Sequence, residues 1–386
     1  MHFTFATPPR IVCGLGAIAT LAQLAPALLG PRILVVTDKG VRACGILDRL
    51  EQTLRQTSVT WEVFDTVVAD PPDHVVLAAA EQARAFGTTG VIGLGGGSPM
   101  DTAKLVALLA ASPGAVLAQA YGVNQVQGGR LPLALVPTTA GTGSEVTPIA
   151  IVTVGGEEKK GVVSPVLVPD LAVLDAELTL ALPAAVTAAT RIDAMVHAIE
   201  AYTSTSANNN PISRTLAREA LRMLGTALER CVSHGDDRVA REQALLGACM
   251  AGQAFANSPV AAVHALAYPL GARFHLSHGL SNALMLPSVM RFNLQASATA
   301  YAQLLPFAFP EASQQGDAET QAHTFVAELE ALIERIGLPR RLRDVGIDEG
   351  QIPNLAADAM QQTRLLVNNP RALGLDDARD IYRRAW

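Results

Sequence analysis

Short apolar runs alternate with amphipathic segments through the first half of the chain. The runs are rich in Val, Ile and Leu, which is typical of strands that are buried on both faces. The segments that follow them repeat apolar residues every three or four positions, as helices do. Strands that alternate with helices predict a parallel sheet with helices on both faces. The predicted strands are residues 32–37, 60–64, 91–94 and 131–137, and the predicted helices run to about residue 55, from 72 to 86 and from 99 to 111.

The pattern changes near the middle of the chain. Residues 149–154 and 166–175, with a turn at Gly155–Gly156, look extended and are expected to complete the first domain. Beyond these segments the strand pattern disappears, and helical periodicity continues to the C-terminus. We therefore expect an α/β fold with a parallel-sheet domain over residues 1–180, followed by an all-helical domain over residues 181–386.

Composition narrows the class of protein. Of the 386 residues, 49% are hydrophobic and 17% are charged, which is typical of a packed globular protein. The net charge is −6 and no basic run appears, so we expect no nucleic-acid partner. The N-terminal segment lacks the pattern of a secretory signal, and the apolar runs are too short to span a bilayer, so no membrane partner is expected. The four cysteines show no paired spacing, which favours reduced thiols in a cytoplasm.

One carboxylate and three imidazoles in the second half form a candidate metal site. Asp193 and His197 are four residues apart on a predicted helix, so they share one face. Such a pair alone is more often a local contact than a metal site. His264 and His278 follow later in the chain. Three neutral imidazoles with one carboxylate suit a divalent cation such as Fe(II) or Zn(II), with a coordination position left for substrate.

A glycine-rich turn joins the third predicted strand to the next helix. Gly95, Gly96 and Gly97 let the backbone approach a ligand closely. Ser98 is expected as the N-cap of the helix, and Asp101 as the acid of a capping box. The exposed N–H groups of that helix end predict an anion site that suits a diphosphate, although such turns also serve packing alone.

Two further features point to a nucleotide. Asp38 ends a predicted strand where a carboxylate can accept both ribose hydroxyls, which favours NAD over NADP. Capping of the next helix explains Asp38 equally well. The loop at 137–145 places hydroxyl groups between glycines. Such a loop can surround a diphosphate or the nicotinamide, but it can also be a solvated turn. Its hydroxyl donors are Thr138, Thr139, Thr142 and Ser144.

The chain resembles the iron-containing (group III) alcohol dehydrogenase family of the dehydroquinate synthase-like fold. The resemblance covers nearly the whole chain and implies an N-terminal dinucleotide-binding domain followed by a helical domain. The motifs that carry it are GGGSPMDTAK, PTTAGTGSEVT, DAMVHAIEAYTS, HALAYPLG and HGLSNALMLPSVMRFN.

The resemblance also implies residue roles. Asp193, His197, His264 and His278 would ligate one Fe(II), with Zn(II) in some relatives. Lys160 falls where relatives carry a lysine that contacts the cofactor, although it also suits a surface loop. The residues implied to hold the NAD(P) diphosphate and nicotinamide are Gly95, Gly96, Gly97, Ser98, Thr138, Thr139 and Thr142.

One position departs from many relatives. They carry a second histidine four residues after the third ligand, where it can relay a proton, and here Tyr268 stands in its place. A phenol is a poorer base than imidazole at neutral pH. With a tyrosine at this position, the chain resembles the hydroxyacid–oxoacid transhydrogenase branch of the family. His275 offers an alternative proton route or is a polar residue near a helix end, and Phe255 is either an apolar wall of the substrate pocket or core.

We therefore expect an NAD(H)-dependent oxidoreductase that interconverts a small primary or secondary alcohol and its aldehyde or ketone. A hydroxy-acid oxidoreductase of the transhydrogenase kind is the first alternative, and a metal-dependent lyase of the dehydroquinate synthase type is the second. A binding protein that keeps the fold with an inactive site is a third. The resemblance also favours a homodimer or higher homo-oligomer.

Overall fold

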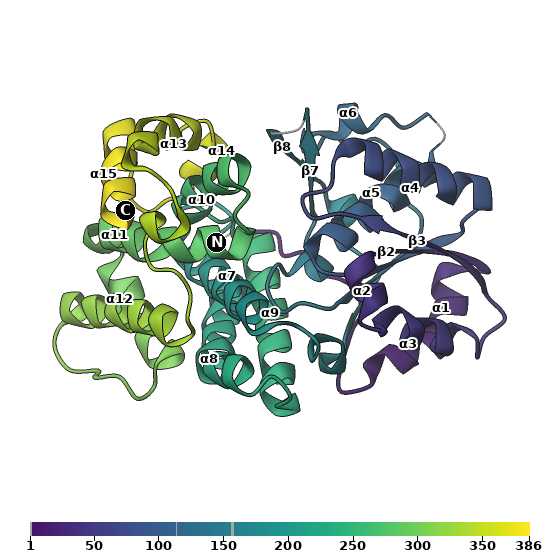
Figure 1. Ribbon diagram of the computed structural model, residues 1–386, viewed down its shortest axis with the longest axis horizontal. Coiled ribbons are helices and arrows are strands. Elements are labelled where there is room, and N and C mark those ends of the chain that lie inside the picture. The colour runs from purple at the N-terminus through teal and green to yellow at the C-terminus, as the bar shows by residue number, and fades with distance from the viewer. Residues whose placement is uncertain (1, 113, 156–157) are drawn as a thin grey trace. The chain divides into compact units, whose positions relative to one another are not determined.

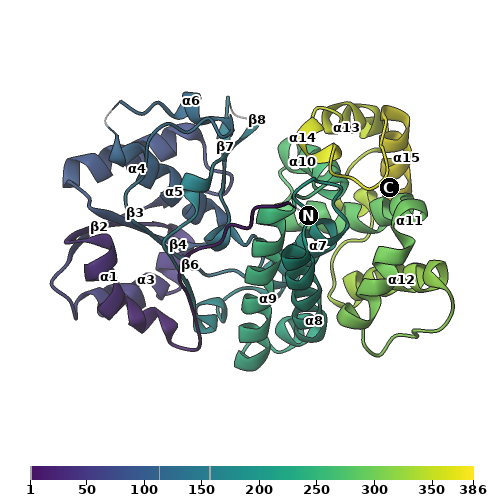
Figure 2. The same ribbon diagram turned by 180° about the vertical axis from the view of Figure 1, so that it is seen from behind.

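The computed structural model describes residues 2–112, 114–155 and 158–386 (Figures 1 and 2). Two compact units make up the chain. One consists of Ala6–Ala181, and the other joins Leu182–Trp386 with the N-terminal residues up to Phe5.

The unit Ala6–Ala181 is built on a six-stranded sheet in which every paired strand is parallel. The predicted parallel sheet is therefore confirmed. Its order is β1-β9-β6-β4-β2-β3. The strands are β1 (Ile11–Cys13), β2 (Arg32–Asp38), β3 (Thr60–Val67), β4 (Gly90–Gly95), β6 (Leu133–Pro137) and β9 (Leu171–Leu174).

Helices cover both faces of this sheet, as Figure 1 shows. In β2, Ile33 and Val35 pack with α1 and α3, whereas Leu34 and Val36 pack with α4 and α5 on the opposite face. Since neighbouring side chains of a strand point to opposite faces, burial of both faces requires a continuous apolar run. The helices of this unit are η1 (Ala17–Thr20), α1 (Leu21–Leu29), α2 (Lys39–Ala43), α3 (Ile46–Leu54), α4 (Asp73–Phe86), α5 (Gly97–Ala111), α6 (Leu117–Ala120), η2 (Ser144–Val146), η3 (Pro165–Leu167) and η4 (Ala176–Thr179).

A second, three-stranded sheet departs from the expected order. It contains β5 (Gly122–Val123), β8 (Glu158–Val163) and β7 (Ile149–Val154), and β7 pairs with β8 in the antiparallel direction. The predicted extended segment 149–154 is therefore a strand of this small sheet, and the later segment 166–175 contributes β9 to the main one. Of the expected turn at Gly155–Gly156, Gly156 lies outside the described residues.

The other unit is helical. Within its described residues no strand occurs, as the loss of strand pattern predicts. No helix in the described part of the chain is both long and apolar enough to cross a bilayer. The helices are α7 (Ala184–Thr203), α8 (Pro211–Ser233), α9 (Arg238–Asn257), α10 (Ala262–Phe274), α11 (His278–Ala308), α12 (Ala318–Arg335), η5 (Leu342–Val345), η6 (Glu349–Gln351), α13 (Ile352–Ala359), α14 (Thr363–Leu366) and α15 (Leu375–Ala385).

Gly225 lies on α8 where this helix packs closely against the end of α11. A Cβ atom there would lie 2.1 Å from the backbone oxygen of Ala308. Alanine normally stabilises a helix by about 1 kcal/mol relative to glycine. A clash with backbone outweighs this gain, because the backbone cannot move without shifting the whole helix.

We therefore expect Gly225→Ala to lower the free energy of unfolding by about 1–3 kcal/mol, measured by urea denaturation followed by circular dichroism. Gly350→Ala is the matched control, since no heavy atom lies within 4 Å of a Cβ placed there. Equal midpoints for both variants would contradict this account of the helix contact.

Candidate active site

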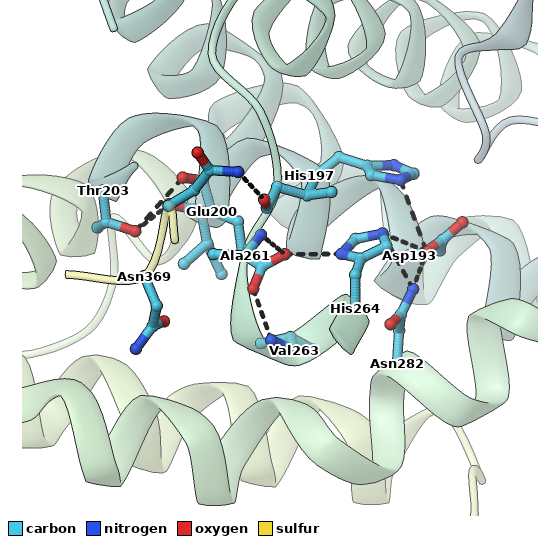
Figure 3. A network of polar contacts seen from close by, with 12 residues as sticks. Asp193, His197, Glu200, Thr203, Ala261, Val263, His264, Asn282 and Asn369 are labelled. Atoms are coloured by element: carbon cyan, nitrogen blue, oxygen red, sulfur yellow. Dashed lines mark hydrogen bonds and ion pairs between the residues drawn. The ribbon is translucent and has the colours of Figure 1, made fainter. Parts of the chain in front are cut away.

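Three helices bring the four predicted metal ligands together. α7 carries Asp193 and His197 one turn apart, α10 carries His264 in its first turn, and α11 begins at His278. One ligand atom from each residue lies within 4.8 Å of every other. Figure 3 shows Asp193, His197 and His264 turned toward this common point.

The distances suit one small cation. Asp193 Oδ1 lies 3.9 Å from His197 Nε2, 3.9 Å from His264 Nε2 and 3.6 Å from His278 Nε2. Ligand atoms about 2.1 Å from a shared cation lie roughly 3–4 Å from one another. The set therefore fits a divalent ion with small ring movements.

The surroundings of Asp193 favour its ionised form, which is the form that binds a cation. Burial alone raises the pKa of Asp193, but the neighbouring imidazoles and a hydrogen bond from Asn282 outweigh it and lower the pKa. The side chains of Asp193, His197 and His264 are almost fully buried, whereas that of His278 is 38% exposed. The open side of the ligand set is thus the side of His278.

Asn282 is a member of the site that the sequence did not reveal. Its Nδ2 donates to Asp193 Oδ1 at 2.6 Å and lies 3.2 Å from His278 Nε2. Its Oδ1 is buried, and no hydrogen-bond partner reaches it within the described residues. A buried carbonyl oxygen of this kind calls for a bound group or water. The only signal in the sequence is that Asn282 follows His278 by one helical turn.

The three residues expected near the reaction differ in their positions. Phe255 is 8% exposed, and its ring stacks on that of His197 with centroids 4.3 Å apart. The ring centroids of Tyr268 and His278 are 5.9 Å apart. His275 is exposed and ends α10 in the left-handed conformation, with φ of 55°. Phe255 and Tyr268 therefore touch the ligand set, and His275 forms the turn between two helices.

The carboxyl ends of β2, β4 and β6 meet at one edge of the parallel sheet, where nucleotides bind in this kind of fold. There the amide of Thr138 donates to Gly95 O at 2.9 Å. Gly95 has φ of 151°, and a Cβ there would lie 2.6 Å from Pro99 and 3.5 Å from Asp38 Oδ2. The other two glycines lie against the loop of residues 137–145, called here the threonine loop: a Cβ on Gly96 would meet Thr139, and one on Gly97 would meet Thr142.

The predicted helix cap at this turn is wrong. α5 begins at Gly97, with Gly96 as an N-cap that makes no side-chain hydrogen bond, so Ser98 lies inside the first turn. Asp101 is not the acid of a capping box. Its Oδ1 accepts from Ser144 Oγ at 2.6 Å and its Oδ2 from the amide of Ile151 at 2.9 Å. The glycines let the helix start earlier, and donors from Ser144 and from strand β7 satisfy the carboxylate instead.

Lys104 explains why the two loops stay together. This lysine is fully buried, and its Nζ donates to Ser144 Oγ at 2.9 Å, Thr147 Oγ1 at 3.1 Å and Ile149 O at 2.6 Å. Burial lowers the pKa of Lys104 to about 8, against the attraction of Asp101. Ser144, expected as a hydroxyl donor toward the nucleotide, donates to Asp101 instead.

Asp38 and Lys160 complete the expected nucleotide residues. Asp38 is the N-cap of α2 and accepts from the amide of Val41 at 2.9 Å through Oδ1, so the capping role is present. Its ribose contact stays a prediction. Lys160 lies on β8 and not in a loop, with Nζ 5.7 Å from the centroid of the Tyr121 ring.

Comparison with known proteins gives the family. The profile of iron-containing alcohol dehydrogenases matches residues 8–176, and the C-terminal profile of the same family matches residues 187–386. Long-chain-alcohol dehydrogenase 1 of Geobacillus thermodenitrificans is 40% identical over 386 residues, spanning 98% of this chain and 95% of that protein. NAD-dependent methanol dehydrogenase of Bacillus methanolicus is 31% identical over 99% of both chains. A solved structure of 1,3-propanediol oxidoreductase superposes with a TM-score of 0.95, at 32% identity and full coverage of both chains.

A parallel sheet with a glycine turn at its carboxyl edge and a helical Asp/His site are the features expected of a metal-dependent oxidoreductase. The chain belongs to the iron-containing alcohol dehydrogenase family, and it is an enzyme that takes iron and NAD as its cofactors. The predicted family, fold class, type of reaction and cofactors are confirmed.

Glu145 gives the unit Ala6–Ala181 a specific pH dependence of its stability. This carboxyl is 2% exposed in the threonine loop, and burial raises its pKa to about 7, against its own backbone amide and the charge of Lys104. Because the folded pKa exceeds the unfolded value, the folded state is favoured by protonation. That contribution is complete below about pH 4.5 and is lost as pH rises through 7.

Glu145→Gln keeps the shape and removes this titration. We expect its free energy of unfolding, relative to the wild type, to rise by roughly 2 kcal/mol between pH 5 and pH 8, measured by urea denaturation. Glu349→Gln, at an exposed carboxylate, should show a constant difference over the same range. A pH-independent difference for Glu145→Gln would show that this carboxyl ionises normally.

Proposed function

We propose that the enzyme reversibly oxidises a small primary or secondary alcohol to its aldehyde or ketone with NAD(H). The observation that carries this proposal is the approach of four ligand atoms within 4.8 Å of one another in a chain of this family. The relatives act on substrates as different as long-chain alcohols and methanol by name, so the size of the alcohol is left open.

The site residues are proposed to share the work as follows. A divalent cation held by Asp193, His197, His264 and His278 would supply Lewis-acid chemistry toward an alcohol or carbonyl oxygen, and NAD would supply hydride chemistry. Phe255 is proposed to line the substrate pocket, and its stacking on the His197 ring supports a place at the edge of the ligand set. An apolar ring there would exclude water from the reacting oxygen.

Tyr268 is proposed as the hydrogen-bond donor to the substrate oxygen. Its ring faces the partly exposed His278, on the side where the ligand set is open. A phenol remains protonated at neutral pH and can donate, but it accepts a proton less readily than imidazole. His275, which is exposed, is the alternative route for proton exchange with solvent.

Tyr268 also favours the second candidate, a hydroxyacid–oxoacid transhydrogenase. Such an enzyme passes hydride between two substrates and produces no net NADH. Net absorbance at 340 nm with an alcohol and NAD distinguishes the proposed dehydrogenase both from this candidate and from a lyase that regenerates its NAD.

The nucleotide is proposed to be held by the glycine turn and the threonine loop, with Lys160 as a further contact. NAD is preferred over NADP because the carboxylate of Asp38 would repel a 2′-phosphate. We further propose a cytoplasmic homodimer or higher homo-oligomer. Its four cysteines, all of them in the described part of the chain, form no disulfide, which supports a reducing compartment.

The first test uses metal-free protein reloaded anaerobically with Fe(II) or Zn(II), screened with C2–C4 alcohols, aldehydes and hydroxy acids and either nucleotide. We expect NAD-dependent turnover that demetallation abolishes. His264→Ala should lose activity at least about 100-fold together with bound metal, since removal of a ligand exceeds the usual cost of disturbing its supports. His323→Ala, at an exposed position on α12, should retain both. Full turnover by demetallated wild-type enzyme would overturn the proposal.

A second test concerns the choice of nucleotide. Asp38→Asn removes the charge but keeps a good N-cap for α2, so thermal stability should change little. We expect the ratio of kcat/KM for NADP over NAD to rise roughly tenfold, equivalent to about 1.4 kcal/mol. Asp48→Asn, at an exposed carboxylate of the same unit, should leave the ratio unchanged. An unaltered ratio in Asp38→Asn would assign this residue to capping alone.

A further inference from the structure

Glu200 is a buried carboxylate next to the metal ligands that the proposed reaction does not use. It lies on α7, seven residues after Asp193 and three after His197, so all three share one face of that helix. We propose that Glu200 is a positioning residue for the metal centre: it sets which nitrogen of His264 carries the proton and fixes the start of the helix that bears this ligand. The inference rests on the metal site of the proposed function.

Three donors from one short segment converge on this carboxylate, as Figure 3 shows. Glu200 Oε1 accepts from the amide of Val263 at 2.7 Å, and Oε2 accepts from the amide of Ala261 at 3.0 Å. Oε2 also lies 2.6 Å from His264 Nδ1. The Glu200 residue is 4% exposed, so water competes little for these bonds.

In the hydrogen bond between His264 Nδ1 and Glu200 Oε2, the imidazole is the donor. The two amides already donate to the carboxylate, and an ionised carboxylate can only accept, so His264 Nδ1 must carry the hydrogen. His264 Nε2 is then left with its lone pair, on the side facing Asp193 Oδ1. A metal binds a ring nitrogen through this lone pair, and a carboxylate behind the ring raises its basicity.

The contact with the amides fixes the helix. α10 begins after Ala261, whose side chain offers no acceptor for the first N–H groups. Such groups need a partner, and a negative charge at a helix N-terminus is favourable. Glu200 supplies both from a neighbouring helix. The same side chain therefore orients the ring of His264 and holds the backbone one and three residues before it.

Glu200→Gln tests the two roles together, since it keeps the shape and removes the charge. The amide side chain can still accept from Val263 N, but its NH₂ group then faces His264 Nδ1. This arrangement favours the tautomer with hydrogen on Nε2, which cannot bind a metal. We expect zinc affinity to fall 10- to 100-fold, measured by competition with a chromophoric chelator, and the rise in Tm upon zinc addition to shrink.

The matched control is Asp317→Ala. Asp317 caps α12 by accepting from the amide of Thr320 at 2.9 Å, so its loss also weakens a helix start. Here we expect a lower Tm for the metal-free protein and unchanged zinc affinity. If Glu200→Gln behaves in the same way, Glu200 is only a helix cap and the inference is overturned.

A measurement on the wild type covers the case in which Glu200→Gln does not fold. Long-range ¹H–¹⁵N correlation spectra of the metal-free protein report the tautomer of each histidine. We expect hydrogen on Nδ1 of His264, and hydrogen on Nε2 would overturn the inference. Wild-type protein that binds neither zinc nor iron would instead contradict the proposed function, which separates the two failures.

Discussion

The metal centre depends on the contacts between the carboxylate of Asp193 and three imidazoles. This carboxylate is buried on α7 and faces imidazoles from three helices, each within 4 Å of one of its oxygens. A buried carboxylate is costly unless it is paired and hydrogen-bonded. Asn282 satisfies part of this requirement by donating to Asp193 Oδ1, and a cation held between the carboxylate and the imidazoles would satisfy the rest. The packing of α7, α10 and α11 therefore positions ligands and compensates a charge at the same time.

The carboxyl edge of the parallel sheet contains a second buried polar cluster, with different chemistry. Lys104 and Asp101 are one turn apart on α5, and both reach donors or acceptors in the segment that contains the threonine loop and β7. An isolated buried lysine would be strongly destabilising, but three acceptors and a nearby carboxylate surround this one. The glycines can approach the threonines closely because this polar cluster holds the two segments together.

The sequence predicts the features that depend on composition and local spacing. β2 and β4 are evident because burial on both faces demands continuous apolar residues, and Asp193 with His197 is evident because four residues make one helical turn. β1 has three residues and carries no recognisable period. Ser98 and Asp101 follow the usual residue preferences of a helix start, but the glycines shift the start of the helix and a tertiary contact captures the carboxylate.

Glu200 and Lys104 show the limit more clearly. Each is a charged side chain that is usually exposed, and here each is buried by contacts with segments distant in sequence. The partners of Glu200 lie 61 to 64 residues away, and those of Lys104 lie 40 to 45 residues away. The local sequence pattern therefore cannot predict these partners. A charged residue on the same helical face as two metal ligands is nevertheless a readable sign, because that face is already assigned to the interior.

Charge balance links these observations to the choice of metal. Asp193 and Glu200 are two buried carboxylates that together carry two negative charges when both are ionised, and imidazoles are neutral when they act as ligands. A divalent cation brings the buried centre to a net charge of zero, whereas a monovalent or trivalent ion leaves one unit uncompensated. Because an unbalanced charge in a largely buried site is costly, the total charge favours a divalent ion such as Fe(II) or Zn(II), as the nitrogen and oxygen ligands do.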